Sequence, residues 1–415
     1  MATNYVHVIR QFNRNVRLYL LAQLFVGLSY FGIFSVLFNL YLLRLGYGTE
    51  TIGVINSGML LGYALFSPFA GSLGRRLGIN RLISLGLAVT MIGFLVLPAA
   101  GVFQGLLRSV WLVAAGGLVW LGMAAVLVNG DVLLYTEAGE EGSGHAFPIF
   151  LALWGFGSFA GSLVAGRLPS LVSGLLQLPV SHPASYGCSL LFSGVLLIPG
   201  LMCLILIKPT GQGSTKVTER APGNAPYGLM LLLVAIQMLQ GTGEGAVRMF
   251  LNVYLADGLR LSTSGIGTLM AVAQLLPVLV ALIAPFFLTR WGNQRVFVWS
   301  SLAIALCLVP LGTVSHWSAA GIGYTGIMAM AWMWRTPFIR YRMALVPPGW
   351  RPLVNGTLNM ALGLSWSAVT LADGYVIATL GYSAFFLGAA ALTAAGTLIF
   401  RFSFPPDQPP VRTRT

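Results

Sequence analysis

The feature that most constrains this sequence is a series of long segments without any charged side chain. The first, Leu18–Leu43, contains 26 residues and no Asp, Glu, Lys or Arg. A bilayer core about 30 Å thick is crossed by about 20 residues of α-helix. The apolar region of a cleavable signal peptide is shorter, about 7–15 residues. We therefore expect this segment to be a membrane-spanning helix and not a signal peptide.

Eleven further apolar segments follow, and only the one that starts at Tyr227 contains charged residues, Glu244 and Arg248. Unbroken apolar runs of this length are typical of helices and not of the alternating strands of a transmembrane barrel. We therefore predict an all-α integral membrane protein with twelve transmembrane helices. The further segments are Thr51–Gly74, Leu82–Leu107, Ser109–Gly130, Ala146–Gly166, Tyr186–Ile207, Tyr227–Ala256, Leu261–Thr289, Val296–Val314, Trp317–Trp334, Leu353–Ala372 and Ser383–Phe400.

The composition agrees with a membrane protein and excludes several other classes. Of 415 residues, 57% are hydrophobic and 8% are charged, whereas a water-soluble protein needs a wettable exterior. The net charge of +13 does not indicate nucleic acid, because such proteins carry their charge on a continuous soluble face. No ATP-binding loop, metal-ligand cluster or nucleophile–base set stands out. We expect no cofactor, no metal and no nucleic acid, and as partners the lipid bilayer and a small solute.

One long polar stretch divides the chain into two halves. Residues 208–226, KPTGQGSTKVTERAPGNAP, are rich in Gly, Pro, Ser and Thr, which is typical of a flexible linker. We predict a six-helix bundle at 1–207, a cytoplasmic linker at 208–226, and a second six-helix bundle with a short cytoplasmic tail at 227–415. We expect this protein to be a monomer.

The distribution of Lys and Arg predicts the orientation. With the N-terminus inside, 17 basic residues fall in cytoplasmic segments and four in external ones: Arg44, Arg108, Arg167 and Arg260. Cytoplasmic loops of membrane proteins carry this excess of Lys and Arg. We therefore expect a multi-pass protein of the cytoplasmic (plasma) membrane with both termini in the cytoplasm.

The two halves repeat several short motifs in the same order, about 214 residues apart. Shared apolar composition does not explain the polar matches, and parallel repeats are an architecture of secondary transporters, with the solute site between the halves. The matched motifs are Asn39-Leu-Tyr-Leu and Asn252-Val-Tyr-Leu, Ile52-Gly and Ile266-Gly, Pro68-Phe and Pro285-Phe, and Arg76-Leu-Gly-Ile-Asn-Arg and Arg290-Trp-Gly-Asn-Gln-Arg.

The loop between the second and third helices contains Gly71, Arg75, Arg76, Gly78 and Arg81. In these residues it resembles the signature loop of the major facilitator superfamily. Six helices, a polar linker and six helices are also similar to that family, and the resemblance covers nearly the whole chain. It implies two pseudo-symmetric six-helix bundles that transport a solute by alternating access.

This loop departs from the family pattern at one position. The family has an acidic residue where this chain has Arg75, and the resemblance implies that the acidic group helps to hold the cytoplasmic side closed. Asp131 and Glu137 lie at the end of the fourth helix. We expect a latch of reversed polarity, in which Arg75 pairs with one of these acids.

Glycines in the fifth helix, Gly157, Gly161 and Gly166, resemble the glycine-rich motif of the family's antiporters. The chain lacks the proline that usually follows the second glycine. Small residues spaced four apart also let two helices approach closely, so helix packing is an alternative explanation.

Glu244 and Arg248 are the most informative pair, because they lie deep within the seventh helix. At a spacing of four residues they share one helix face. A charge at this depth costs at least about 2.5 kcal/mol unless it is paired or faces water. We predict that the pair faces a cavity, and that Glu244 binds solute or exchanges a proton. The alternative is a self-neutralising pair that only fixes the helix.

Other polar and aromatic residues are secondary candidates for a solute or coupling site. Their alternative roles are ordinary ones, namely an interfacial position for the charged residues and core packing for the tryptophans. These candidates are Asp131, Arg335, Asp373, Trp154 and Trp366. We assign Trp332 and Trp334 to an aromatic belt at the membrane surface.

The interpretation that the sequence favours is a secondary active transporter, with proton-coupled efflux (proton antiport) of a small organic compound. Uptake of an organic anion, with Arg248 as its counter-charge, is an alternative. A polytopic membrane enzyme would need a polar catalytic cluster, and the only acidic cluster is Glu137, Glu140 and Glu141 near His145. We therefore do not expect an enzyme, and a receptor of the same fold stays open.

Reporter fusions test the orientation. A reporter placed after Lys216 and a second one at the C-terminus should both report the cytoplasm, because basic residues flank both positions. An external signal from either fusion would contradict the predicted topology.

Overall fold

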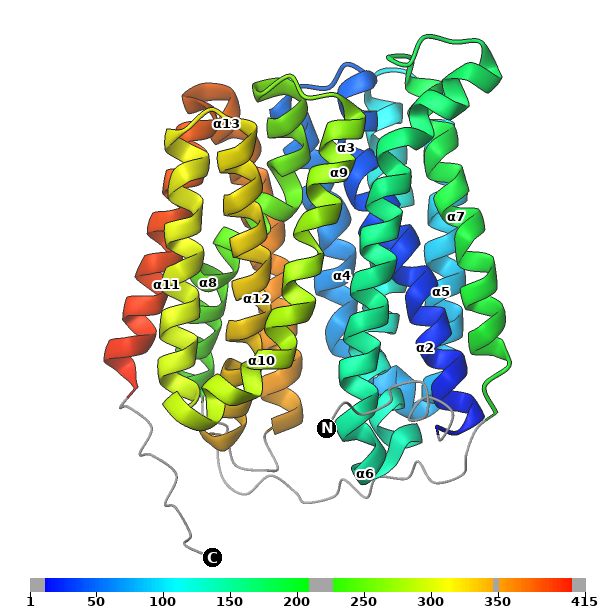
Figure 1. Ribbon diagram of the computed structural model, residues 1–415. Helices are drawn as coiled ribbons and strands as arrows, with labels where there is room; N and C mark the ends of the chain where they lie inside the picture. The colour runs from blue at the N-terminus through cyan, green and yellow to red at the C-terminus, as the bar shows by residue number, and fades with distance from the viewer. Residues whose placement is uncertain (1–11, 209–226, 346–350, 405–415) are drawn as a thin grey trace, which may run out of the picture.

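The computed structural model describes residues 12–208, 227–345 and 351–404, and every regular element within these ranges is a helix. Helices satisfy all backbone polar groups within one segment, which an apolar surrounding requires. The helices run side by side in two bundles (Figure 1).

The first bundle contains the helices before the linker. α2, η1 and α3 follow each other without a break, and η1 is a π-helical segment. α6 comprises two helices that meet at Gly139, where φ is 71°. The elements are α2 (Arg14–Val26), η1 (Gly27–Phe34), α3 (Ser35–Arg44), α4 (Thr49–Leu77), α5 (Ile79–Val96), η2 (Leu97–Val102), α6 (Gly105–Leu176) and α7 (Pro183–Ile205).

The second bundle repeats this pattern. A π-helical segment, η3, again lies in its first long helix, and α13 comprises two helices that meet at Gly381, where φ is 80°. The elements are α8 (Tyr227–Val253), η3 (Tyr254–Gly258), α9 (Thr263–Ala273), α10 (Leu275–Trp291), α11 (Asn293–Thr313), α12 (Trp317–Leu345) and α13 (Arg351–Ser403).

The number of spans in the described ranges is consistent with the prediction. Within the described ranges, ten segments are long and apolar enough to cross a membrane. One of them, Thr357–Ser403, contains the turn at Gly381 and therefore two helices, and α12 adds a further helix of 29 residues. The fold is thus all-helical, as predicted, and consistent with twelve spans.

The internal repeat is visible in the backbone of two loops. Gly78, between α4 and α5, has a φ of 90°, and Gly292, between α10 and α11, has a φ of 80°. A side chain is strained in this conformation, so glycine is required in both copies. The repeated Arg-x-Gly motif thus makes the same turn in each bundle.

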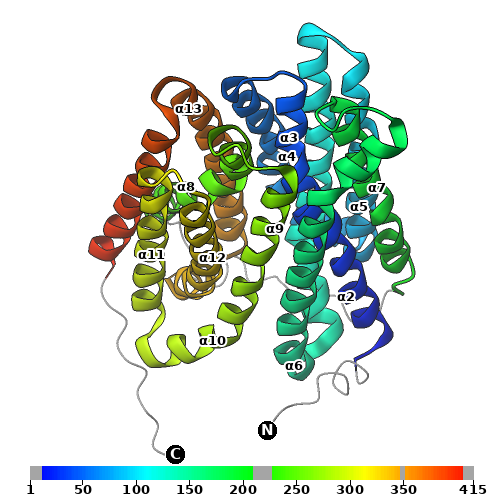
Figure 2. The ribbon, with the colours of Figure 1, turned by 45° about the horizontal axis from the view of Figure 1, so that its top comes forward.

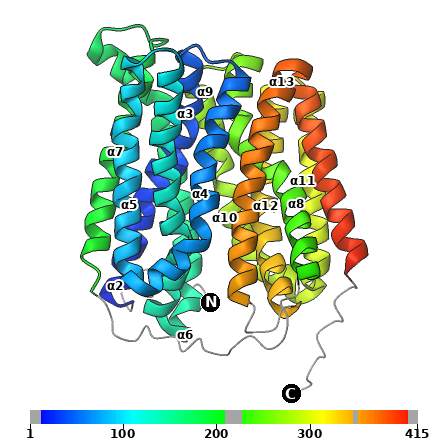
Figure 3. The same ribbon diagram turned by 180° about the vertical axis from the view of Figure 1, so that it is seen from behind.

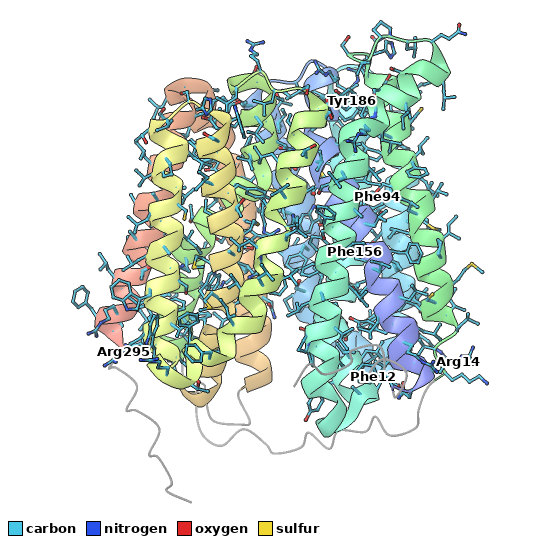
Figure 4. The ribbon with its side chains drawn as sticks, viewed as in Figure 1. Phe12, Arg14, Phe94, Phe156, Tyr186 and Arg295 are labelled. Atoms are coloured by element: carbon cyan, nitrogen blue, oxygen red, sulfur yellow. The ribbon has the colours of Figure 1, made fainter. Side chains whose placement is uncertain are left out.

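Labelled residues distinguish the two ends of the bundles. Arg14, at the start of α2, and Arg295 lie at one end, and Tyr186 lies near the other end (Figure 4). We call the end with Arg14 and Arg295 the terminal face, and the end with Tyr186 the opposite face. The sides of the bundles expose many large apolar side chains, such as Leu65, which suits contact with lipid.

Small residues form the contacts between the bundles. α4 lies beside α13 (Figure 3), where Gly53 packs against Thr370 and Gly374. On the other side of the molecule, Gly166 of α6 packs against Gly267 of α9. A Cβ atom at any of these glycines would overlap or crowd the facing backbone, so the close approach depends on them.

Hydrogen bonds between the bundles gather in the half next to the opposite face. Asn252 Nδ2 donates to the carbonyl oxygens of Ser35 and Val36, both at 3.1 Å, and Asn39 Nδ2 donates to the Met249 carbonyl. Asn39 and Asn252 are the matched residues of the repeat. We call this exchange the asparagine clasp.

Two further residue pairs support the clasp through hydrogen bonds. Ser57 and Ser367 are 2.9 Å apart through their hydroxyl oxygens, and Tyr186 and Thr263 are 2.8 Å apart. Among the described residues, no hydrogen bond joins the bundles near the terminal face. The bundles diverge toward that face (Figure 1), so the structure is closed at the opposite face.

Removal of the clasp should open the opposite face. Asn252→Ala deletes two donated hydrogen bonds, each worth about 1 kcal/mol net, which favours the open form by about tenfold or more. The measurement is the labelling rate of a Ser57→Cys variant with a membrane-impermeant maleimide, because Ser57 is buried in the contact. Asn129→Ala is the matched control, since Asn129 bonds only within its own bundle. Equal rates in both variants would contradict the role of the clasp.

Candidate solute-binding site

A buried carboxylate with two guanidinium partners lies in the second bundle. Arg248 Nε donates to Glu244 Oε1 at 2.7 Å, and Arg335 Nη2 donates to the same oxygen at 2.8 Å. Glu244 is 1% exposed, whereas Arg248 and Arg335 are 22% and 35% exposed. Glu244 is therefore enclosed, and the two arginines are partly open to their surroundings.

The depth of this cluster explains why the partners are needed. α8 and η3 together form a membrane-length segment of 32 residues, Tyr227–Gly258, and Glu244 lies near its middle. A charge at this level is costly unless it is paired, and the two arginines provide the pairing from α8 itself and from α12.

The cluster carries one uncompensated positive charge. Both arginines use Glu244 Oε1, and Oε2 has no hydrogen-bond partner among the described residues. Tyr30 and Tyr324 are close enough to Arg248 to interact with it electrostatically, and they are neutral groups in their usual state. One carboxylate with two guanidinium groups leaves a net charge of +1.

A small cavity between the bundles reaches Arg248. Its volume is about 30 Å³, which is room for about two water molecules. A larger solute therefore needs the surrounding side chains or bundles to move apart. The cavity is lined by Phe31, Leu151, Trp154, Gly155, Ser158, Arg248, Gln274, Pro277, Val278 and Trp332.

Three aromatic rings from three elements form one wall of this cavity. Phe31 of η1 and Trp154 of α6 meet edge to face with centroids 4.4 Å apart. Trp332 of α12 meets Trp154 in the same way at 5.2 Å, across the boundary between the bundles. The indole Nε1 of Trp154 is buried and has no hydrogen-bond partner among the described residues.

A break in the eighth span supplies the remaining wall. α9 ends at Ala273 and α10 begins at Leu275, and the two helices meet at an angle (Figure 2). Pro277 has no N–H with which to continue the helical ladder at this point. The break brings Gln274, an uncharged polar side chain, to the cavity.

Of the secondary candidates from the sequence, Arg335 and Trp154 lie at the charge cluster or the cavity, and Trp366, Asp131 and Asp373 do not line the cavity. Arg335, for which an interfacial position was the alternative, pairs with Glu244, and Trp154 lines the cavity. Trp366 packs over Gly241 and Gly245 of α8. Asp131 is exposed on α6 and forms no ion pair with the described residues. Asp373 is buried in α13, apart from the arginine cluster.

The predicted latch involves a side chain outside those that the structure describes, that of Arg75. Arg76 and Arg81 are exposed, and Gly71 and Gly78 lie in the same loop region. Glu137 Oε2 accepts a hydrogen bond of 2.8 Å from Asn15 within the first bundle. The latch therefore stays a prediction.

The glycines that resemble the antiporter motif lie in helix contacts. Gly157 faces Leu24 and Leu28, and Gly161 faces Gly32 of η1, where a Cβ atom would overlap the backbone. Gly166 belongs to the contact with α9. These positions explain the glycines by packing alone.

The assignment of Trp332 and Trp334 to an aromatic belt was wrong. Trp332 lies in the cavity wall, and Trp334 is buried against Phe297 and Phe338 in the core of the second bundle. Both residues precede Arg335 on the same helix. If the depth of Arg335 had been recognised, the sequence would have indicated that its neighbours are also inside.

Comparisons with known proteins agree on one family. The model of the Major Facilitator Superfamily matches residues 233–415. An uncharacterized MFS-type transporter of Burkholderia mallei (strain SAVP1) is 26% identical over 369 residues, which cover 86% of this chain and 84% of that protein.

Two solved structures share the fold over nearly the whole chain. A mutant of the nucleoside transporter NupG has a TM-score of 0.75 at 15% identity and covers 95% of this chain and 100% of its own. A D-xylose-proton symporter has a TM-score of 0.72 at 12% identity and covers 97% and 99%. At these identities the similarity concerns the fold and not the solute.

A mutant cycle tests the charge cluster. Glu244→Gln should lower the free energy of unfolding by about 3 kcal/mol, because it leaves two guanidinium groups without a counter-charge. Arg335→Gln should cost less than half of that, since Arg335 is 35% exposed and water screens it. The double variant should be more stable than Glu244→Gln alone.

The measurement is thermal unfolding in detergent, followed by tryptophan fluorescence. Glu50→Gln is the control, because Glu50 is exposed and its loss should change stability by less than about 0.5 kcal/mol. Additive effects of Glu244→Gln and Arg335→Gln would show that the two charges are not coupled.

Proposed function

The chain is a member of the major facilitator superfamily, and we propose that it transports a small organic anion with an apolar or aromatic part by alternating access. The observation that carries this proposal is the uncompensated positive charge of Glu244, Arg248 and Arg335 beside an aromatic cavity between the bundles. Related folds carry solutes as different as a nucleoside and D-xylose, so the fold does not select the solute, and the charge of the site does.

The arginines supply the contact to the anionic group. Arg248 uses Nε and Arg335 uses Nη2 for Glu244, so both keep further N–H donors. Guanidinium groups bind carboxylates and phosphates through paired hydrogen bonds. Glu244 acts as the permanent counter-ion of the two arginines. It limits the free-energy cost of burying their charges when no solute is bound.

The aromatic wall supplies the contact to the rest of the solute. Phe31 and Trp154 belong to the first bundle, and Arg248, Arg335 and Trp332 belong to the second. A solute between them contacts both bundles at once. Binding can therefore draw the bundles together at the terminal face, which alternating access requires.

Glu244 is better suited to the role of counter-ion than to that of proton carrier. A proton on Glu244 would leave two guanidinium groups facing each other without a counter-charge. The resemblance to the antiporter motif also lends no support to export, because those glycines lie in helix contacts. We therefore favour an organic anion over proton-coupled efflux through Glu244.

The orientation within the membrane completes the proposal. With the terminal face in the cytoplasm, the described conformation is closed to the outside, because the asparagine clasp lies next to the opposite face. The basic residues of the terminal face support this orientation. Transport then alternates between this form and one in which the clasp is broken.

A binding and transport assay with purified protein tests the solute class. Aromatic carboxylates and organic phosphates should bind and accumulate in proteoliposomes, whereas sugars and organic cations should not. Arg335→Gln should weaken binding at least tenfold, because it removes one charged donor from the site.

Arg401→Gln is the matched control, since Arg401 is exposed at the end of α13 and loses the same charge. It should bind like the unaltered protein. Equal binding of anions and cations, or equal weakening by Arg335→Gln and Arg401→Gln, would contradict the proposal.

A further inference from the structure

Asp373 is a buried acidic residue, only 8% exposed. One of its carboxyl oxygens, Oδ2, is buried and has no hydrogen-bond partner among the described residues. Thr370, one turn earlier on α13, also has a buried hydroxyl without a partner. Buried polar atoms are nearly always hydrogen-bonded, so this pair calls for an explanation.

The position of Asp373 connects it to the contact between the bundles. Thr370, one turn before Asp373, and Gly374, directly after it, pack against Gly53 of α4 in the first bundle. Asp373 itself lies two helical turns after Trp366, on the helix face that packs against α8. It therefore borders the surface that must separate when the opposite face opens.

The charged and titratable groups on the surrounding helices do not compensate Asp373. α4 contributes Glu50, whose backbone lies against Gly374. α8 and η3 contribute Arg248, which pairs with Glu244, and Tyr254 and Asp257, which both lie near Tyr382. α11 contributes the thiol of Cys307. α12 contributes Tyr324 and Arg335, of which Arg335 is already paired with Glu244. No ion pair or hydrogen bond joins any of these described groups to Asp373.

We propose that Asp373 is a proton-binding site of the opposite face, and that this face closes only when Asp373 is protonated. An ionised carboxylate enclosed without a cation or hydrogen bond costs several kcal/mol, whereas the neutral acid costs far less. The proton comes from the solution at the opposite face, which lies about 12 Å from Asp373 along α13, measured to the turn at Gly381.

The sign of the pH dependence follows from this binding. The closed form holds one more proton than the open form, on a carboxyl oxygen of Asp373. Acid therefore favours closure, and a rise in pH favours opening, with a change in the open-to-closed ratio of up to about tenfold per pH unit. Opening returns the proton to the same solution, so the step is balanced without any other reactant.

This inference rests on the alternating-access function proposed above, and it concerns the gate and not the solute site. The test is a distance measurement by electron paramagnetic resonance between spin labels at Glu50→Cys and Leu380→Cys, with Cys188, Cys203 and Cys307 replaced by alanine. Both labelled residues are exposed near the opposite face, on α4 and α13. The label at Glu50 also removes the carboxyl group that α4 contributes near Gly374.

In the labelled parent protein, the long-distance population should grow as the pH rises from about 5 to about 9. Asp373→Asn has the shape of the neutral acid, so it should stay closed over the whole range. Asp257→Asn is the matched control, because Asp257 is exposed at the same face, and it should respond like the parent.

Three outcomes would overturn the inference. The first is a pH response of Asp373→Asn equal to that of the parent. The second is a parent that responds to an added organic anion but not to pH, which leaves alternating access intact and removes the role of Asp373. The third is a distance that changes with neither anion nor pH, which contradicts the alternating-access proposal as well.

Discussion

The balance of charge around Glu244 is the interaction on which the rest of the site depends. A carboxylate in the middle of a membrane helix needs a positive partner, and this one has two, from α8 and α12. The second arginine ties two helices of one bundle together and leaves a charge that no described protein group neutralises. The same cluster thus stabilises the second bundle and, in the proposed function, binds the anionic group of the solute.

The contacts between the bundles are built so that they can part. Gly53 meets Gly374, and Gly166 meets Gly267, so no long side chain is interlocked across the boundary at these points. The polar links are a few hydrogen bonds from Asn39, Asn252 and Ser57, which water can replace when the face opens. Close packing and easy separation therefore come from the same small residues.

Local sequence patterns predicted much of this structure. They did not predict the contacts between residues that are far apart in the sequence. Charge-free segments predicted the spans, and the four-residue spacing predicted the pairing of Glu244 with Arg248. Arg335 is 91 residues from Glu244, and no local pattern links them. Likewise, the repeat identified Asn39 and Asn252, but the hydrogen bonds that they exchange depend on how the two bundles dock. Trp332 was misplaced because tryptophan suits both a membrane surface and a cavity wall.

The two proposals together predict which closed form of the protein has the lowest electrostatic free energy. An anion in the aromatic cavity cancels the net positive charge of Glu244, Arg248 and Arg335. A proton on Asp373 neutralises a second buried group, at the contact of α13 with α4. With both bound, neither the arginine cluster nor Asp373 leaves an uncompensated charge in the membrane interior, whereas either ligand alone leaves one charge there. Closure of the opposite face over a loaded site therefore favours the anion and the proton together, although they bind to separate groups.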